Sequence, residues 1–330
     1  MSAASAERPR CAVVLCSYNG ERFLPAQLAS LKSQSLQPAV YVLSDDASTD
    51  GTWALLQAFA SERHAAGCKV VLHRNDINMG YVRHFEQALQ QAVDVEVLFP
   101  CDQDDVWHPK KLERMLAPFA TRPDLLILHA DARLVDADGQ ATGRGLFEVL
   151  EVTADEIAAM HDGRAFDVLL RRNVVTGAAM ALRPRLLEQA LPVGEGWAHD
   201  EWLALWGAML GEADTLNEVL VDYRQHGDNQ IGVTPKQGLQ QIGLGMDRSA
   251  FMRNAEARWQ VMHDHANSRR MLSVTVASLH ERWRHAQARA RRASSALRRV
   301  AVVWREWQSG RYTRFGHGAK SAFADLLGID

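Results

Sequence analysis

Long hydrophobic runs are missing from this sequence, although 47% of its 330 residues are hydrophobic. No apolar run approaches the ~20 residues that a helix needs to span a bilayer. Residues 1–10 contain no hydrophobic core segment, so we expect no signal peptide. Cysteine is also scarce, and Cys11, Cys16, Cys68 and Cys101 show neither paired metal-ligand spacing nor a disulfide framework. We therefore expect a reduced, cytoplasmic protein whose cysteines are small core residues.

Two glycine-rich nucleotide-binding motifs are absent as well. The sequence contains neither the dinucleotide fingerprint GxGxxG nor the phosphate loop GxxxxGK[ST]. It does contain short apolar runs separated by turns and helical patterns, and we expect strands at 11–16, 40–43, 70–72, 95–99 and 125–129. Strands that alternate with helices predict an α/β fold whose mostly parallel sheet is covered on both faces. A nucleotide bound by this sheet would be held in some other way.

Acidic and basic residues are distributed unevenly along the chain. Residues 234–330 carry 17 Lys and Arg against 7 Asp and Glu, whereas the first 233 residues have a net charge of −13. We therefore predict a domain at 1–233 and a basic helical C-terminal extension at 234–330. Arginines interleaved with Trp304 and Trp307 are typical of helices that bind the membrane interface. A helical cap that packs on the first domain is the alternative, and no nucleic-acid-binding module is recognisable.

The stretch 99–107, FPCDQDDVW, places three carboxylates directly after an expected strand. The carboxyl ends of parallel strands form the crevice in which open α/β sheets bind ligands. Oxygen ligands this close together suit Mg²⁺ or Mn²⁺, which take one or two carboxylates and complete their shell with water and phosphate. The alternative is an acidic turn in which Asp105 caps a helix that begins near Pro109.

Loop 44–52, SDDASTDGT, also follows an expected strand. Its Asp50 can cap the next helix, which is the plain structural interpretation. An aspartate in such a crevice can also accept the imide N–H of a uracil or thymine ring.

Three segments of the second half carry further polar candidates. Residues 173–182 predict a strand with a glycine near its middle, which indicates a bulge or a close approach of the backbone to another group. Asp200 and Glu201 open an amphipathic helix, where the helix dipole favours acidic residues and keeps Asp200 ionised. After another apolar strand, Arg224 is a candidate diphosphate clamp and a neutral His226 a candidate metal ligand.

The order CSYNG, SDDASTDGT, NMG and DQDDVW resembles family 2 glycosyltransferases, which have the GT-A fold. The sequence is most similar to the rhamnosyltransferase-like branch that builds lipopolysaccharide, O-antigen and other bacterial surface polysaccharides. The resemblance spans about 13–232. It implies a mixed, mostly parallel sheet flanked by helices, to which the C-terminal helical extension is added.

The resemblance implies a nucleotide-binding role for two loops. Asp46 matches the aspartate that holds the nucleotide base, and Ser17 and Asn19 fall in the turn that contacts the base. One departure is Ala47, where the family usually has glycine. The change alters the conformational freedom of the loop and removes no ligand.

The resemblance also assigns the acidic block and the YRQHG block. Asp102 and Asp104 match the DxD pair, in which the second aspartate meets the metal and the first lies nearer the ribose. His226 matches a metal or diphosphate contact, and Arg224 is a secondary candidate for contact with the diphosphate or the acceptor. The implied cofactor is Mg²⁺ or Mn²⁺.

On the acceptor side, the resemblance places Thr176 and Gly177 in the wall of the acceptor site. Asp200 matches the general base of a block that usually reads HDWW. Here Glu201 replaces the first aromatic residue, so either acid is a candidate, and Asp200 is favoured because it occupies the family position.

Together these features predict an inverting, metal-dependent glycosyltransferase. It would move a sugar, with rhamnose from dTDP-rhamnose as first choice, from a dTDP- or UDP-type donor to a glycan or lipid-linked glycan at the cytoplasmic face of the inner membrane. A nucleotidyltransferase is the first alternative, but it usually needs a glycine-rich loop with a lysine after the first strand, and 16–20 offers neither. A non-catalytic binder of glycans or nucleotide sugars is the second.

Overall fold

A computed structural model describes residues 9–227, 248–291 and 296–327. The chain forms two compact units. The first comprises Met1–Ala165, Val174–Val193 and Ala198–Val233, and the second comprises Phe166–Asn173, Gly194–Trp197 and Thr234–Asp330. The predicted boundary between positions 233 and 234 lies outside the described residues. Two short segments from within the predicted first domain belong to the second unit.

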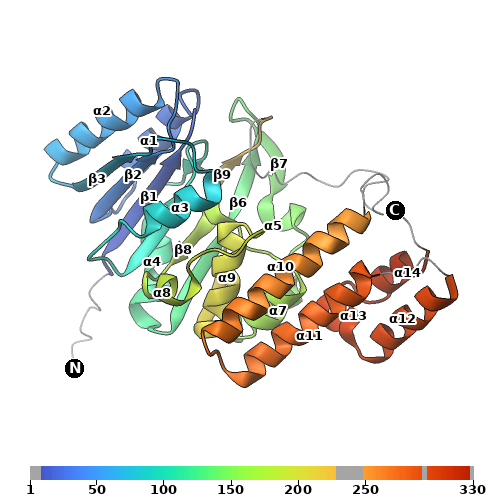
Figure 1. Cartoon of the computed structure of the whole chain (residues 1–330). Helices are drawn as coiled ribbons and strands as arrows, with labels where there is room; N and C mark the ends of the chain where they lie inside the picture. The colour runs from blue at the N-terminus through green and yellow to red at the C-terminus, as the bar shows by residue number, and fades with distance from the viewer. Residues whose placement is uncertain (1–8, 228–247, 292–295, 328–330) are drawn as a thin grey trace, which may run out of the picture. The chain divides into compact units, whose positions relative to one another are not determined.

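The first unit is built on one mixed sheet (Figure 1). Its strands run in the order β3-β2-β1-β4-β8-β6-β9-β5, and β7 pairs with β6. The long pairings β3–β2, β2–β1, β1–β4 and β6–β9 are parallel, while the short pairings of β8, β5 and β7 are antiparallel. The strands are β1 Cys11–Ser17, β2 Val40–Asp45, β3 Lys69–Arg74, β4 Val97–Cys101, β5 Val106–Trp107, β6 Leu125–Val135, β7 Ala141–Gly145, β8 Met180–Leu182 and β9 Glu212–Arg224.

Helices cover both faces of this sheet. The strands β1, β2 and β4 are buried along their whole length, as apolar parallel strands between two helical layers must be. One face packs on α1 Leu24–Lys32, α2 Thr52–Ala65 and α4 Lys111–Thr121. The other face packs on α3 Tyr81–Leu89 and α9 His199–Leu210. Shorter elements of this unit are α5 Leu146–Val149, α6 Ala154–His161, the 3₁₀ helix η1 Gly177–Ala179 and α8 Arg185–Ala190, and α7 Ala165–Arg171 leads into the second unit.

The second unit is helical in the described residues. Its main helices are α10 Arg248–Ser268, α11 Ser273–Ala290, α12 Ala296–Gln308, α13 Arg311–Phe315 and α14 Ala319–Leu327. The Trp197 and Trp259 rings meet edge to face with centroids 5.1 Å apart, which joins one of the short segments to α10. No helix in the described part of the chain is long and apolar enough to cross a bilayer.

One alternative and one local prediction were wrong. The helix expected near Pro109 begins at Lys111, but the alternative in which Asp105 caps it is wrong, because Lys110 is the N-cap residue and Asp105 Oδ1 accepts a hydrogen bond from the Arg224 backbone N–H at 3.0 Å. The strand expected at 173–182 is limited to β8, because the backbone of Gly177–Ala179 turns into a 3₁₀ helix. In both places a tertiary contact overrides the local pattern.

Candidate active site

The candidate residues gather where β1, β2 and β4 end. Ser17 ends β1 opposite Asp45 of β2, and Leu15 of β1 lies opposite Cys101 at the end of β4. Since these strands are parallel neighbours, the loops that follow them lie at the same edge of the sheet. This is the edge at which open α/β sheets bind ligands.

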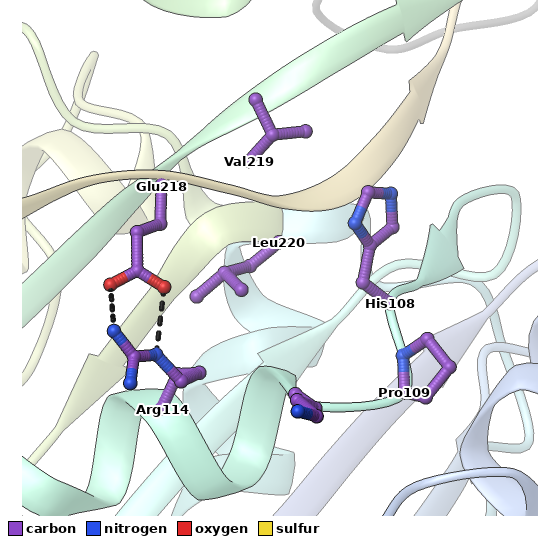
Figure 2. A pocket seen from close by; sticks show the side chains of 7 residues that line it. His108, Pro109, Arg114, Glu218, Val219 and Leu220 are labelled. Atoms are coloured by element: carbon purple, nitrogen blue, oxygen red, sulfur yellow. Dashed lines mark hydrogen bonds and ion pairs between the residues drawn. The ribbon is translucent and has the colours of Figure 1, made fainter.

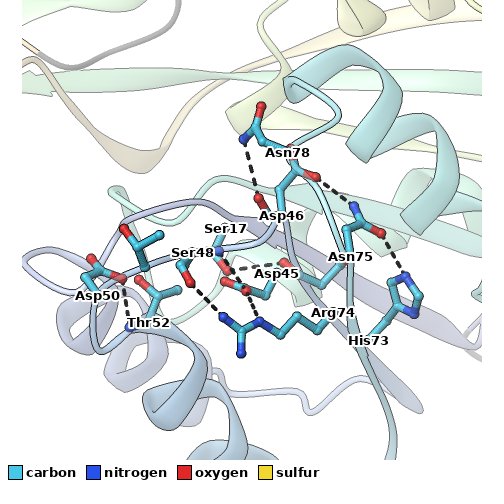
Figure 3. A network of polar contacts seen from close by, with 12 residues as sticks. Ser17, Asp45, Asp46, Ser48, Asp50, Thr52, His73, Arg74, Asn75 and Asn78 are labelled. Carbon is cyan, nitrogen blue, oxygen red and sulfur yellow. Dashed lines mark hydrogen bonds and ion pairs between the residues drawn. The ribbon is translucent and has the colours of Figure 1, made fainter.

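A polar network holds the loop that follows β2 (Figure 3). The buried Asp46 carboxylate accepts hydrogen bonds from Asn75 Nδ2 at 2.7 Å, from the Met79 N–H at 3.0 Å and from the Gly80 N–H at 3.1 Å. Asp45 is fully buried and pairs with Arg74 Nε at 3.1 Å. Asp46 therefore fixes the turn before α3, and its role in holding a nucleotide base stays a prediction.

The turn after β1 is tied to this loop. Asn19 adopts a left-handed backbone conformation, with a φ of 48°, and its Oδ1 accepts a hydrogen bond from the Thr49 N–H at 2.9 Å. The Asn19 N–H in turn donates to Ser48 Oγ at 2.9 Å. The Ser17 hydroxyl is buried and donates to the Ser44 carbonyl at 3.2 Å. Both predicted residues thus shape the turn.

Ala47 has a φ of 64°, in the left-handed region that favours glycine. This conformation costs an L-residue roughly 1–2 kcal/mol, partly offset by the extra chain entropy that glycine would lose. We expect Ala47→Gly to raise the free energy of unfolding by about 0.5–1 kcal/mol in urea titrations. The same change at Ala54, exposed within α2, should lower it by about as much. Equal destabilisation by both changes would contradict the left-handed backbone at position 47.

Gln103 closes the acidic loop onto the turn after β1. Its Oε1 accepts a hydrogen bond from the Tyr18 N–H at 2.8 Å, and its Nε2 donates to the Tyr18 carbonyl at 3.0 Å. The amide lies over Gly20, where a Cβ would come within 2.1 Å of Gln103 Oε1. Gly20 therefore makes room for this side chain.

Negative charge is concentrated at the acidic loop. Burial, and then the charges of Asp104 and Asp200, raise the pKa of Asp102 to about 7. Burial also raises the pKa of Asp105, with Asp104 and Asp102 adding to the effect. The structure thus brings Asp200, from α9, within electrostatic range of the DxD pair after β4. A site with this excess of carboxylates favours a cation.

His226 and Asp104 are adjacent. His226 Nε2 lies 2.9 Å from Asp104 Oδ2, and its ring stacks on Phe23 with centroids 4.4 Å apart. The guanidinium of Arg224 is committed to the main chain, since it donates to the Asp104 carbonyl at 2.8 Å and to the Ala137 carbonyl at 3.0 Å. Arg224 therefore braces the acidic loop, and its role as a diphosphate clamp stays a prediction.

Lys111 is a charged residue of the site that the sequence analysis missed. It is fully buried at the first position of α4, its Nζ lies 3.5 Å from the centroid of the Trp107 ring, and it donates to the Ala178 carbonyl at 2.6 Å. Burial lowers the pKa of Lys111 to about 7, while Cys101 and Asp105 oppose this shift. The available signal was its spacing, because Lys111 shares the apolar face of α4 with Met115.

Asp200 lies in the first turn of α9 and is held by two backbone groups. Asp200 Oδ2 accepts a hydrogen bond from the Gly177 N–H at 2.8 Å, and its Oδ1 accepts one from the Glu201 N–H at 2.7 Å. Both bonds and the helix N-terminus stabilise a charged carboxylate. A Cβ on Gly177 would lie 3.3 Å from Asp200 Cβ, so the glycine allows the predicted close approach. Thr176 precedes it as the residue before η1.

His199 is a second residue that the sequence analysis did not select. It is buried, stacks on Phe85 with centroids 4.3 Å apart, and places Nε2 within 3.2 Å of a Cβ built on Gly177. Neither ring nitrogen has a hydrogen-bond partner in the part of the chain that the structure describes. Burial lowers the pKa of His199, so the ring is neutral beside Asp200.

These residues fit a divalent cation. Asp104 and His226 present an oxygen and a nitrogen side by side, and burial together with the charges of Asp104 and Asp200 raises the pKa of Asp102, so a cation would stabilise its charged form. Among the described residues, no three His, Cys, Asp or Glu side chains are grouped to hold a metal. A cation here would therefore take one or two protein ligands and complete its shell with water and phosphate, as Mg²⁺ does.

A separate pocket lies where β9 and the start of α4 meet (Figure 2). Its volume is about 480 Å³, and it contains none of the predicted site residues. Arg114 and Glu218 pair across it, with Arg114 Nε 2.8 Å from Glu218 Oε2, so their charges cancel. It is lined by His108, Pro109, Lys110, Arg114, Glu218, Val219 and Leu220.

Comparison with known proteins agrees with this geometry. Residues 12–164 match the family described as Glycosyl transferase family 2. An uncharacterized glycosyltransferase of Nostoc sp. is 25% identical over 225 residues, which cover 67% of this chain and 66% of that protein. The chain therefore spans just under two thirds of the length of this curated relative.

Solved structures share the fold at low identity. S. aureus TarS 1–349 in complex with UDP-GlcNAc superposes with a TM-score of 0.53 at 16% identity, covering 96% of this chain and 89% of that one. GalNAc-T7 with UDP, GalNAc and Mn²⁺ has a TM-score of 0.52 at 13% identity, covering 81% and 55%. The predicted GT-A fold is confirmed. Residues 12–164, which carry the loops after β1 and β2 and the acidic block, are similar to glycosyl transferase family 2.

Proposed function

We propose that this protein transfers a sugar from a nucleoside-diphosphate donor to a hydroxyl of a glycan, with inversion at the anomeric carbon. The observation that carries the proposal is the placement of Asp200. Asp200 belongs to α9, far along the chain from the acidic loop, yet it lies close enough for its charge to help raise the pKa of Asp102, after burial and Asp104. A carboxylate opposite a diphosphate site is what in-line displacement at a sugar carbon requires.

In this mechanism, Asp200 accepts the proton of the acceptor hydroxyl as its oxygen attacks the anomeric carbon. The Gly177 and Glu201 N–H groups keep the carboxylate oriented and charged before the reaction. Asp104 and His226 would hold Mg²⁺ or Mn²⁺, which when bound neutralises the charge of the leaving diphosphate. Asp102 faces the ribose in this assignment, and the turn at Ser17 and Asn19 lies against the base.

The donor is proposed to be a pyrimidine nucleotide sugar, with dTDP-rhamnose as first choice. Support comes from the sequence of the acidic block and from the UDP-containing complexes of TarS and GalNAc-T7, the second of which also contains Mn²⁺. The acceptor is proposed to be a glycan or lipid-linked glycan of a surface polysaccharide such as lipopolysaccharide. Such an acceptor places the enzyme at the cytoplasmic face of the inner membrane, with residues 1–233 as catalytic domain and 234–330 as the membrane-associated part.

Titration of the protein with dTDP, UDP and GDP in the presence of Mg²⁺ tests the proposal. We expect dTDP or UDP to bind at least about tenfold more tightly than GDP, since an unpaired buried polar group costs about 1–3 kcal/mol. Slow hydrolysis of the preferred donor to free sugar and nucleoside diphosphate should accompany binding. Formation of sugar phosphate and nucleoside triphosphate on addition of pyrophosphate would instead identify a nucleotidyltransferase. Binding without any turnover would favour a non-catalytic binder.

A further inference from the structure

One side of α12 exposes a continuous apolar stripe. Its residues are spaced by three, four and three positions, which places them on a single helix face. They are Leu297, Val300, Trp304 and Trp307, with 84%, 53%, 60% and 44% of their surface exposed. On the neighbouring α14, Phe323 and Leu327 are 62% and 51% exposed. We call these six side chains the α12–α14 face.

An adjoining side of α12, which carries the buried Val303 and Glu306, already has its packing partners. Val303 forms a small core with Tyr312 of α13 and Ala322 of α14. Because these contacts fix the helices against one another, the exposed stripe is not needed to fill the core of this unit. Two exposed tryptophans on one short helix are unusual for a solvated surface and mark an interaction site.

The exposed charges of segment 296–327, which carries the face, are of one sign. Between positions 296 and 327 the two acidic side chains, Glu306 and Asp325, are each only 4% exposed. Glu306 accepts hydrogen bonds from Arg311 at 2.9 Å and lies 2.8 Å from His285 Nδ1. Asp325 accepts bonds from Arg289 at 2.7 Å and from the Tyr312 hydroxyl at 2.8 Å.

The exposed charged side chains of the same segment are basic. Arg305, Arg314 and Lys320 lie on the surface, and no acidic side chain is exposed anywhere between 296 and 327 in the described structure. Indole rings flanked by cations, with the acids turned inward, match the chemistry of an anionic lipid surface. A second copy of the chain would bring the same cations face to face, which is unfavourable.

We propose that the α12–α14 face docks on an anionic lipid bilayer, with Trp304 and Trp307 inserted at the headgroup level. The benefit of such docking rests on the proposed function, because a lipid-linked acceptor would lie in the same membrane surface. The face lies parallel to the membrane plane in this arrangement and does not span it.

Flotation of the full-length protein with vesicles tests the docking. We expect binding to mixed phosphatidylglycerol and phosphatidylcholine vesicles, weak binding to pure phosphatidylcholine, and partial release by salt.

Trp304→Ser combined with Trp307→Ser should weaken binding by about tenfold or more. Arg305→Gln combined with Lys320→Gln should weaken it by about 25-fold, since each cation contributes about fivefold near an anionic surface. A matched control is Leu272→Ser combined with Val274→Ser, two exposed apolar residues at the α10–α11 turn, which should bind as the wild type does.

Two outcomes would overturn the proposal. One is binding that is equal for neutral and anionic vesicles and unchanged in the tryptophan variant. The other is a dimer in light scattering that the tryptophan variant converts to monomer, without vesicle binding, which would make the face a subunit interface. Hydrolysis of a soluble donor should be unaffected in all three variants. A wild-type protein that binds vesicles but never hydrolyses a donor would refute the proposed function and leave this inference intact.

Discussion

Asp200→Asn is expected to reduce sugar transfer by roughly 10²–10⁴-fold, the usual contribution of a general base. The amide retains the size of the side chain, and its oxygen can still accept a hydrogen bond from the Gly177 N–H, so α9 should remain in place. Donor affinity should stay within a few-fold of the wild type, because Asp200 acts on the acceptor hydroxyl. Single-turnover rates and donor titrations on the same preparation separate the two effects.

Glu201→Gln is the matched control, since it makes the same chemical change one position along the same helical turn. We expect a rate close to that of the wild type, because the Glu201 contact to this site is made by its backbone N–H. If the two variants exchange phenotypes, Glu201 is the base. If both remain fully active, another group removes the proton and the proposed mechanism fails.

Removal of divalent metal is expected to abolish transfer, and Mg²⁺ or Mn²⁺ should restore it. Asp104→Asn should lower transfer by at least about 10²-fold at saturating metal, because a neutral amide is a much weaker ligand at the diphosphate. The protein should stay folded, since the Asp104 side chain pairs with His226 and is not part of the apolar core. Thermal unfolding and Mn²⁺-dependent nucleotide affinity are the accompanying measurements.

Asp155→Asn provides the control for the loss of a carboxylate. Asp155 is exposed in the first turn of α6, so the substitution should leave metal dependence and rate unchanged. Full activity of the wild type in excess chelator would exclude a metal role for Asp104.

The positions of the parallel strands along the chain, and the polar loops that follow them, could be predicted from the sequence because their signals are local. The buried runs of β1, β2 and β4 are apolar and short, and polar residues begin where each strand ends. Parallel pairing then brings these strand ends together without further information. The block 99–107 was identifiable for the same reason, since its carboxylates follow β4 directly.

What could not be predicted depends on contacts between distant segments. Lys111 can be buried beside the acidic loop only because the Trp107 ring and the Ala178 carbonyl contact its ammonium group, and residue 178 lies far along the chain. The single pairing of Leu98 with Leu182 inserts β8 between β4 and β6, and no pattern in 173–182 indicates it. Likewise, the local sequence allows Asp105 to be a helix cap, and only the fold shows that its carboxylate accepts a hydrogen bond from the distant Arg224 backbone N–H.

The contact between Gln103 and Gly20 has a consequence for the evolution of this site. The Gln103 amide pairs with both backbone groups of Tyr18, in the way that a neighbouring strand would, and occupies the space where any other residue at position 20 would place its Cβ. Positions 20 and 103 are therefore expected to covary among homologues. A chain with a side chain at position 20 should carry a shorter residue than glutamine at position 103. Such a chain would lose the two hydrogen bonds that tie the acidic loop to the β1 turn.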